Sequence, residues 1–586
     1  MNKQEYDVLL VLLQDHIASQ REIAAKTGHA LGAVNKSLKV LEQEGFVKGL
    51  QVTAKAKKLR REHAPKNAVI LAAGFGMRMV PINQETPKAL LTINKETLIE
   101  RQIRQLQEAG IREIHVVVGF MKEQFDFLID QYGVDLIVNP RYASHNNLSS
   151  LALALPYIGN TYIIPCDVWC EQNPFSRSEL YSWYMVSDLV DDESDVRINR
   201  KNELVRVKAS PGNAMIGISY LCGEAAETVK SRIEAFSRNR SYDGCFWEEA
   251  LYTDDRMIVT AREVQASAVA EINTYEQLRE IDEGSDQLRS DALECAAEVF
   301  HCDPKEITGI EVLKKGMTNR SFMFCCRGDK YIMRIPGAGT DQLISRRQEA
   351  EVYRAIRGRG LCDDPVYINP ENGYKITKYL KGVRTCDPDN PEDLVKAIAK
   401  MREFHGMKIS VGHTFDIFGQ MEFYERLRED TPSMYRDYEA VKANVLSLRK
   451  YIDAQKKDLC LTHIDAVPDN FLICRDENGR EQIQLTDWEY SGMQDPHVDI
   501  AMWCIYSLYD REQSDRLIDL YFDGMCPSDV RCKIYCYIAS CGLLWSNWCE
   551  YKAKLGVEFG EYSLRQYRYA KDFFRYAKEM MEGGSI

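Results

Sequence analysis

The sequence predicts a multidomain protein that combines α/β and α+β architecture in three successive domains. Its 586 residues exceed what a single hydrophobic core usually organises. Helical spacing dominates the first sixty residues, buried strands alternate with helices in the middle, and short strands precede long helices in the last half. We place the domains at 1–63, 66–285 and 290–586, with the polar stretch at 283–291 as a linker.

The charge and the cysteine content narrow the classes of protein to which the chain can belong. The net charge is −13, but residues 1–63 hold 11 basic and 7 acidic side chains, a net charge of +4, which leaves −17 for the rest. A nucleic-acid contact is therefore expected in the first segment if anywhere. The 18 cysteines include no CxxC pair, and no secretion signal or apolar run of membrane-spanning length occurs. We expect a cytoplasmic protein with free thiols and no membrane contact.

The first domain follows the order of a winged helix-turn-helix. Helices are expected at 5–15, 20–27 and 31–44, followed by two extended pieces, GFVKG and LQVTAKAKKL. This order resembles the MarR-like DNA-binding modules, whose third helix enters the major groove. That resemblance implies that DNA would face Asn35, Lys36 and Lys39. The alternative is a small helical module used for docking or for forming a homodimer.

The second domain reads as a doubly wound α/β sheet. AVILAAG at 68–74 is a continuous apolar run, and further buried strands are expected at 114–120, 134–139, 161–167 and 213–221. A helix is expected at 97–109, and the domain ends near 271–282. Buried strands that alternate with helices are typical of this architecture.

A glycine-rich loop follows the first of these strands. In LAAGFGMRMVPINQETPKALL, at 71–91, small residues let the backbone approach a triphosphate, and two cations can stabilise its charge. The spacing resembles the signature of the sugar-phosphate and phosphocholine nucleotidyltransferases. That resemblance implies nucleotide binding by Ala72, Ala73, Gly74 and Gly76, and catalytic roles for Arg78 and Lys88.

The nucleotidyltransferases also need Mg²⁺ at the end of a buried strand. IIPCD places Asp167 there, and EIN in a later strand offers Asn273 as a second ligand. A simple strand-end cap is the alternative for Asp167. Stretches such as NPRYASHNNLSSLALAL at 139–155 resemble the Lic-type CTP:phosphocholine cytidylyltransferases, and the match covers about 66–285.

Phosphocholine recognition follows from the cytidylyltransferase resemblance. A quaternary ammonium group cannot donate hydrogen bonds, so aromatic faces and carboxylates must bind it. The candidates are Trp183, Tyr184, Trp247 and Glu248, each of which could instead be a core residue.

The third domain carries a phosphoryl-transfer motif on a bilobal, kinase-like layout. Strands are expected at 307–312, 321–328 and 330–335, and long helices at 391–405, 420–455 and 512–585. LTHIDAVPDNFLI is followed by a strand that ends in an aspartate. Phosphoryl transfer to a hydroxyl needs a carboxylate base and metal ligands on the nucleotide. We assign Asp465 as the base and Asn470 and Asp487 as Mg²⁺ ligands, and expect His463 to shape the loop.

Upstream residues complete the expected ATP site. KKGMTNRSF at 314–322 takes the place of a glycine-rich loop, and Thr318 and Asn319 would contact the nucleotide. Arg334 occupies the position of the protein-kinase strand lysine and can pair with Glu349 on the next helix.

The stretch from about 290 to 580 resembles bacterial choline kinases of the choline/ethanolamine kinase family. Gly-Met-Thr-Asn-x-x-Phe and Asp-Trp-Glu-Tyr-x-x-Met-x-Asp-Pro carry the resemblance. It implies a trimethylammonium pocket built from Trp488, Glu489, Tyr490 and Trp503.

Together the two resemblances imply one chain that uses ATP, CTP and Mg²⁺ to convert choline through phosphocholine to CDP-choline. Two alternatives stay open: the same chemistry on ethanolamine or another amino alcohol, and a transcription regulator whose enzyme-like domains sense nucleotide or choline. We expect residues 1–63 to be dispensable for both reactions, because every catalytic motif lies after Pro65.

Overall fold

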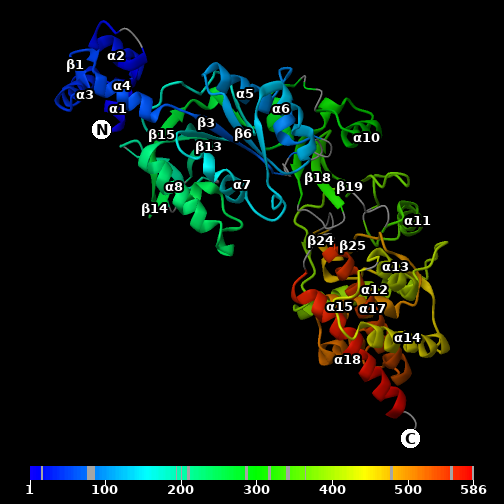
Figure 1. Cartoon of the computed structure of the whole chain (residues 1–586). Coiled ribbons are helices and arrows are strands. Elements are labelled where there is room, and N and C mark those ends of the chain that lie inside the picture. The colour runs from blue at the N-terminus through cyan, green and yellow to red at the C-terminus, as the bar shows by residue number, and fades with distance from the viewer. Residues whose placement is uncertain are drawn as a thin grey trace. The chain divides into compact units, whose positions relative to one another are not determined.

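The computed structural model confirms the predicted fold class (Figure 1). It describes every residue except 15–16, 75–78, 80–85, 193, 200, 208–210, 284, 286–287, 314–318, 338–342, 363, 430, 476–478, 555–558 and 584–586. The chain divides into two compact units. The first is Met1–Glu294 with Gly309–Val312, and the second is Cys295–Thr308 with Leu313–Ile586. None of the described helices is both long and apolar enough to cross a membrane.

The winged helix begins with the three predicted helices, α1 (Lys3–Gln14), α2 (Gln20–Thr27) and α3 (Leu31–Gln43). A hairpin of β1 (Val47–Lys48) and β2 (Gln51–Val52) follows. The second extended piece is wrong beyond Val52, because Ala54–His63 forms helix α4. The Thr53 side chain accepts a hydrogen bond from the Ala56 backbone N–H, and this N-cap starts the helix.

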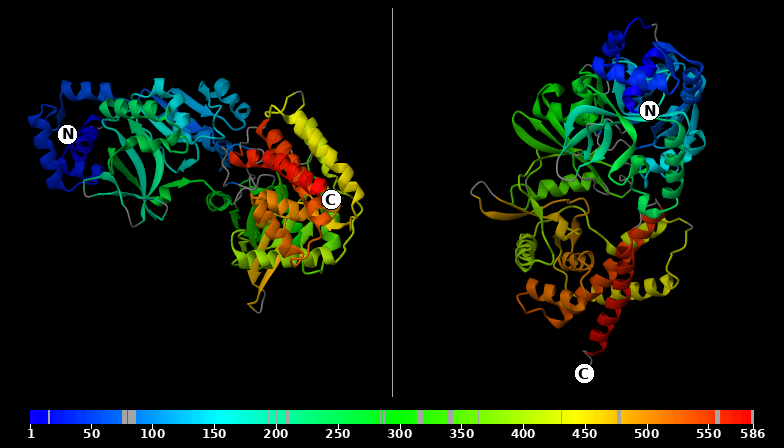
Figure 2. Two further views of the ribbon diagram at one scale, coloured as in Figure 1. Left: turned by 90° about the horizontal axis from the view of Figure 1, so that it is seen from below. Right: turned by 90° about the vertical axis from the view of Figure 1, so that its left-hand side faces the viewer.

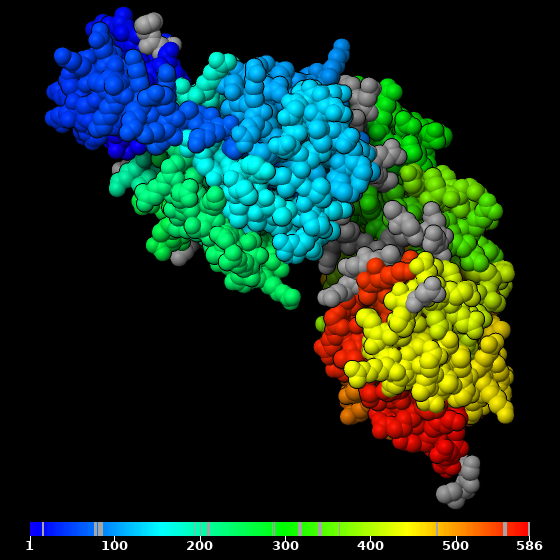
Figure 3. Space-filling model, in the orientation of Figure 1, coloured from blue at the N-terminus to red at the C-terminus, as the bar shows by residue number. Residues whose placement is uncertain are grey.

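The winged helix shares its hydrophobic core with the α/β domain of the same unit. Figure 3 shows the surface of the winged helix, in dark blue, against that of the α/β domain. Leu180 is fully buried among the apolar side chains of α1 and α3. The Tyr181 hydroxyl donates to Asp7 over 2.8 Å, and Asn160 Nδ2 donates to the Glu62 carbonyl over 2.6 Å. These contacts join residues 1–63 to the α/β domain, so whether that segment is dispensable for both reactions stays a prediction to be tested.

The α/β domain is built on a mixed sheet with strand order β11-β12-β15-β10-β13-β8-β3-β6-β7. Its parallel part comprises β8 (Thr161–Pro165), β3 (Asn67–Ala72), β6 (Glu113–Val118) and β7 (Asp135–Val138), as the apolar runs predict. Side chains alternate between two cores. Helices α5 (Leu98–Glu108) and α6 (Phe127–Tyr132) cover one face, and α7 (Asn147–Leu153) and α8 (Gly223–Phe236) cover the other.

The other half of this sheet was largely missed by the sequence reasoning. The predicted strand at 213–221 is β13 (Gly212–Leu221), and it runs antiparallel to β8 and to β10 (Trp183–Asp191). Next come β15 (Arg256–Val264), β12 (Glu203–Arg206) and β11 (Val196–Ile198). A separate pair, β9 (Val168–Cys170) and β16 (Val269–Glu271), brings the two predicted metal-binding segments together.

The second unit has a small antiparallel sheet followed by a helical lobe. The sheet includes β18 (Asn319–Cys326), β19 (Asp329–Pro336), β21 (Lys375–Lys378) and β20 (Tyr367–Ile368), with α11 (Arg346–Ile356) after β19. Four short strands of the lobe are β23 (Cys460–Thr462), β24 (Phe471–Arg475), β25 (Glu481–Leu485) and β26 (Gly492–Gln494).

Helix α12 (Pro391–Gly406) matches its prediction, but two predicted long helices are divided. The stretch 420–455 contains α13 (Ile417–Leu427) and α14 (Tyr438–Ala454), separated by a segment with Pro432, which cannot continue a helix. The stretch 512–585 contains α16 (Arg511–Tyr521), α17 (Ser528–Lys554) and α18 (Glu561–Gly583). Figure 2 shows α18 in red along the orange α17, and α15 (His497–Tyr506) also packs on α17.

Candidate active sites

Three predicted residues of the α/β domain meet at the end of strand β8. Asp167 follows this strand, and the Ile272 backbone N–H donates to the Asp167 carbonyl over 2.9 Å, which fixes Asn273 beside it. Lys88 Nζ reaches both side chains, at 2.5 Å from Asp167 Oδ2 and 2.6 Å from Asn273 Oδ1. Pro87 precedes Lys88, which begins a short 3₁₀ turn and is itself buried. A buried cation is thus held between two oxygen ligands.

The same residues fit a divalent cation. Asp167 Oδ1 is buried and has no hydrogen-bond partner, so one carboxylate oxygen is available to a ligand. Asn273 Nδ2 donates to Glu271 Oε1 over 2.6 Å, which turns its Oδ1 toward Lys88 and Asp167. Oxygen atoms from carboxylate and amide groups are the donors that Mg²⁺ prefers. Among the described residues no three His, Cys, Asp or Glu side chains form a metal cluster, so a cation here would also need the amide and ligand phosphates.

The glycine-rich loop is described only at its start and end. Ala72 ends β3, and the Ala73 carbonyl accepts from the Phe120 backbone N–H over 3.1 Å. Gly74 is exposed, and a Cβ atom built on it would meet no other atom. Gly76 and Arg78 lie outside the described residues. The described part leaves room for a ligand beside the first glycine.

Three of the four phosphocholine candidates lie on one face of the sheet. Tyr184 and Trp247 belong to the same core, and the Tyr184 hydroxyl donates to Glu248 Oε1 over 3.1 Å. Burial raises the pKa of Glu248 to about 7, and nearby Glu271 and Asp167 add to the shift. Trp183 is the next residue along β10 and therefore points to the opposite face, where it stacks on the Arg262 guanidinium at 3.6 Å.

The second unit holds its catalytic-loop candidates between β23 and β24. Asn470 Nδ2 donates to the backbone carbonyl of Asp465 over 2.9 Å and to its Oδ2 over 3.0 Å. The Asp499 carboxylate accepts the backbone N–H groups of His463 and Ile464, over 2.9 and 2.8 Å, and so fixes this loop. His463 is fully buried, and its Nε2 lies 2.9 Å from the Thr486 carbonyl oxygen. These contacts match the loop-shaping part expected of His463.

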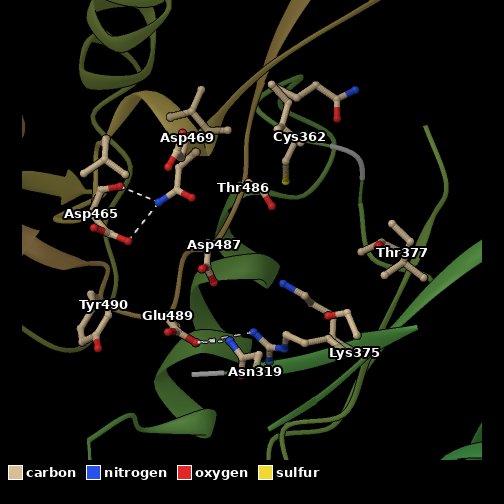
Figure 4. Close-up of a pocket in the computed structure, with 18 of the residues that line it drawn as sticks. Asn319, Cys362, Lys375, Thr377, Asp465, Asp469, Thr486, Asp487, Glu489 and Tyr490 are labelled. Carbon is tan, nitrogen blue, oxygen red and sulfur yellow. Dashed lines mark hydrogen bonds and ion pairs between the residues drawn. The ribbon is translucent and has the colours of Figure 1, made fainter. Parts of the chain in front are cut away.

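Asp465, Asn470 and Thr486 line a cleft of about 1200 Å³ (Figure 4). Asp487 lines the same cleft and adopts a left-handed backbone conformation with φ +65°. Burial, together with the negative charges of Asp487 and Glu489, raises the pKa of Asp465 to about 8. The arrangement concentrates acidic oxygens that require a cation for neutralisation.

The predicted ion pair between β19 and α11 is present. Arg334 binds Glu349 through both terminal nitrogens, with Nη2 at 2.8 Å from Oε2, and Nη2 also donates to the Gly373 carbonyl over 3.0 Å. Asn319 Nδ2 donates to Glu489 Oε2 over 3.0 Å, and Arg346 lies 3.4 Å from the same oxygen. The structure thus brings Glu489 to the cationic side of the cleft. Thr318 lies outside the described residues.

Aromatic side chains form another wall of the cleft. Tyr490 lines it, edge-on to Trp545 with ring centres 5.8 Å apart. The sequence reasoning missed the others, which come from α15 and from the chain at and after α17: Tyr506, Trp545, Trp548, Phe559 and Tyr562.

Trp488 and Trp503 are fully buried away from this cleft. The Trp488 indole donates to the Leu485 carbonyl and packs against Phe404, while Trp503 packs against Phe471. The sequence signal that could have indicated the aromatic wall is the Trp-Ser-Asn-Trp spacing at 545–548 on one helix.

Sequence models of three families match the chain in the same order as its domains. Winged helix-turn-helix DNA-binding matches residues 1–48, the MobA-like NTP transferase domain matches 68–181, and choline/ethanolamine kinase matches 310–517.

Two relatives and one solved structure are matched by this chain over nearly their full lengths. Choline-phosphate cytidylyltransferase of Streptococcus pneumoniae is 32% identical, over 37% of this chain and 96% of its own. The 2-aminoethylphosphonate cytidylyltransferase of Lancefieldella rimae is 31% identical, over 37% of this chain and 92% of its own. The crystal structure of choline kinase LicA from Streptococcus pneumoniae is 27% identical, covers 48% of this chain and 97% of its own, and has a TM-score of 0.42. The chain belongs to the choline-phosphate cytidylyltransferase family, and it joins to that domain a winged helix and a choline/ethanolamine kinase domain.

Proposed function

We propose that this enzyme makes CDP-choline from choline in two steps. Residues 290–586 would transfer the γ-phosphoryl group of ATP to choline, and residues 66–285 would transfer CMP from CTP to the resulting phosphocholine. The observation that carries the proposal is the presence of two separate catalytic sets on one chain, Asp465 with Asn470 and Asp487, and Lys88 with Asp167 and Asn273. In this pairing the product of the kinase is the substrate of the cytidylyltransferase.

In the kinase step, Asp465 would accept the proton of the choline hydroxyl. The hydroxyl oxygen then forms a bond to the γ-phosphorus as the bond to ADP breaks. Asn470 and Asp487 would hold Mg²⁺ on the ATP phosphates, where it neutralises developing charge. The hydrogen bond from Asn470 orients the Asp465 carboxylate and leaves the Asn470 amide oxygen for a metal.

The aromatic wall supports choline as the substrate rather than ethanolamine. A trimethylammonium group gains from contact with π faces and cannot use hydrogen-bond acceptors, whereas a primary ammonium needs them. Tyr490, Trp545 and Trp548 supply such faces on the cleft that also holds Asp465.

In the cytidylyl step, a phosphate oxygen of phosphocholine would attack the α-phosphorus of CTP, and pyrophosphate would leave. Lys88 would stabilise the charge that develops on the phosphates. Asp167 and Asn273 would hold Mg²⁺, and Tyr184, Trp247 and Glu248 would contact the headgroup. The pair from Lys88 to Asp167 supports these roles, because a triphosphate can take over the cation and free the carboxylate.

The decisive experiment follows ADP and pyrophosphate separately with the purified full chain. We expect ADP when choline and ATP are present, and pyrophosphate when CTP is added with phosphocholine. Ethanolamine is the competing kinase substrate, and 2-aminoethylphosphonate, the substrate named for one relative, is the competing acceptor of CMP. Faster turnover of either competitor would replace the choline assignment. Saturable binding of nucleotide without either product would favour a sensing regulator.

The exposed face of α3 supports a second proposed function, binding of duplex DNA. Asn35, Lys36 and Lys39 are all exposed, while the opposite face of the helix is buried in the winged-helix core. Lysine contacts to phosphates make affinity fall steeply with salt. Lys36→Ala and Lys39→Ala should weaken binding of a mixed-sequence duplex together. A docking surface would give a different result. DNA binding would stay at a background level that does not depend on salt, and light scattering would show a dimer that Lys36→Ala and Lys39→Ala disrupt.

A further inference from the structure

We propose that Lys375 is the side chain that binds the phosphates of ATP. The sequence suggests Arg334 for this role. The proposal rests on the proposed kinase function and names a further binding residue in its site. Lys375 is in β21, directly opposite Arg334 in β19 in the antiparallel register. Both side chains are buried and line the cleft that contains Asp465 and Asp487.

Both terminal nitrogens of Arg334 are bound to protein groups, and among its nitrogens the buried Nε has no hydrogen-bond partner in the described part of the chain. Both terminal nitrogens bind the Glu349 carboxylate, and one of them also binds the Gly373 carbonyl oxygen. A bidentate pair of this kind neutralises the guanidinium and fixes its plane. Contact of Nη2 with a phosphate would require Arg334 to give up part of that pair or the bond to Gly373. Its position therefore suits it to brace α11 against the sheet.

Lys375, by contrast, keeps hydrogen-bond donors that a ligand can use. Its ammonium donates to the Tyr353 hydroxyl over 2.6 Å, and the nearest carboxylate oxygen, of Glu349, is 3.7 Å away. An ammonium carries three donors, so the bond to Tyr353 leaves capacity for a ligand. Figure 4 shows Lys375 extending into the cleft toward the side where Asp487 and Glu489 lie.

The electrostatics favour an anion beside this ammonium. Glu349 is shared by Arg334, Arg346 and Lys375, so one carboxylate faces three cations. Glu489 adds a second carboxylate, within 3.9 Å of Arg334 and 3.4 Å of Arg346. Burial lowers the pKa of Lys375, and the charge of Arg334 lowers it further. A polyphosphate supplies the charge that a buried ammonium lacks. A metal held by Asp487 and an ammonium at Lys375 would contact the polyphosphate from two sides.

The test compares ligands that differ in phosphate content on the full-length protein. Binding of adenosine, ADP and the nonhydrolysable AMP-PNP with Mg²⁺ is measured by calorimetry for wild type, Lys375→Met, Lys375→Gln and Lys375→Arg. A hydrogen bond to a charged group is typically worth a factor of roughly 10 to 100 in affinity. We expect the Met and Gln variants to lose that factor for AMP-PNP and to keep the wild-type affinity for adenosine. A guanidinium fits beside Tyr353 less well than an ammonium but keeps the positive charge, so Lys375→Arg should recover part of the loss.

Two controls separate phosphate binding from a structural part in the ion-pair cluster. Lys330→Met removes an exposed cation from β19 and should change no affinity. Equal losses for adenosine and AMP-PNP would assign Lys375 to the fold, and unchanged AMP-PNP binding would refute the proposal outright. If the Met variant fails to fold, the Gln variant decides, because its amide can still bond to Tyr353. Wild-type protein that binds no adenine nucleotide would instead contradict the kinase assignment itself.

Discussion

The Tyr181 hydroxyl donates a hydrogen bond of 2.8 Å to the Asp7 carboxylate, and this bond joins the cytidylyltransferase domain to the first helix of the winged helix. Asp7 also lies 2.9 Å from His29 Nε2, so the contact reaches the start of α3. The neighbouring Leu180 is buried in the winged-helix core, and its carbonyl lies 2.7 Å from His63 Nδ1. Three residues after Tyr181 comes Tyr184, which bonds Glu248. The winged helix and the proposed phosphocholine site therefore contact one short stretch of backbone.

Shortening the chain to residues 64–586 should impair cytidylyl transfer and spare the kinase. The truncation exposes Leu180 and Tyr181, which are now covered by α1 and α3. The milder Leu180→Ala change should lower the free energy of unfolding of the first unit by about 2–5 kcal/mol, the usual effect of emptying a buried leucine site. Thermal unfolding with each activity followed separately gives the measurement. A 64–586 protein with wild-type pyrophosphate release and wild-type melting would mean that the shared core is unimportant.

Replacement of Asp465 by asparagine should abolish phosphorylation of choline and leave cytidylyl transfer to added phosphocholine intact. The amide cannot accept the hydroxyl proton, and loss of a positioned base typically slows a reaction by about 10² to 10⁴. The two reactions are assayed on the same preparation, so the unaffected cytidylyl activity reports correct folding of the first unit. Equal loss of both activities in a folded variant would contradict two separate sites.

Asp465 should also make the stability of the kinase unit depend on pH. Its pKa is about 8 in the folded protein because of burial, above its ordinary value of 3.8. Between these values the folded state binds the proton more tightly than the unfolded chain, so stability falls as pH rises from about 4 to about 8. Denaturant unfolding at several pH values should show this decline, with a smaller one in Asp465→Asn. Glu489, with a pKa of about 7, contributes to the decline in both proteins, so the test is the difference between the two curves. Parallel curves would show that Asp465 is ionised in the free enzyme.

Local signals explain what the sequence could predict. His463, Asp465 and Asn470 lie within one loop, and the neighbouring strands set the geometry of that loop. Their types and spacing in the sequence therefore predict that they lie together. Lys88, Asp167 and Asn273 are far apart in the chain, yet each follows a recognisable turn or strand end. The start of α4 could also have been read from Thr53, an N-cap residue before a run of good helix formers.

Contacts made by tertiary packing could not be predicted in the same way. Trp488 follows Asp487 directly but turns into the core, because Asp487 occupies a left-handed conformation two residues after β25. Trp545 and Trp548 lie some sixty residues later and reach the cleft only because α17 packs against the lobe. Trp183 and Tyr184 diverge because neighbouring residues of a strand face opposite sides, a distinction that requires β10 to be recognised as a strand.

Loss of an aromatic face from the cleft should weaken binding of choline specifically. In Trp545→Leu the apolar volume is largely retained, while the π surface beside Tyr490 is removed. A desolvated cation–π contact is worth up to about 2 kcal/mol, so the choline KM should rise roughly tenfold or more. The ATP KM should stay constant, and the KM for ethanolamine should change less because hydrogen bonds bind a primary ammonium. A parallel rise of the ATP and choline KM values would indicate a general distortion of the cleft.

Replacement of Lys88 by alanine should cripple pyrophosphate release from CTP and leave ADP formation unchanged. Lys88 is buried between Asp167 and Asn273, at 2.5 and 2.6 Å, and is poised to move from these oxygens to a triphosphate. A single donor to developing charge contributes roughly 3 kcal/mol to transition-state stabilisation, so the rate should fall by about 10² to 10³.

Lys66→Ala removes an exposed cation just before β3 and is the matched control, with no loss expected. Removal of Lys88 also leaves Asp167 without its cation, so the variant should need no more Mg²⁺ than wild type for half-maximal activity. Unchanged cytidylyl transfer in Lys88→Ala would reduce Lys88 to a loop-stabilising residue. A loss of rate that excess Mg²⁺ fully restores would mean that Lys88 acts through Asp167 and not on the phosphates.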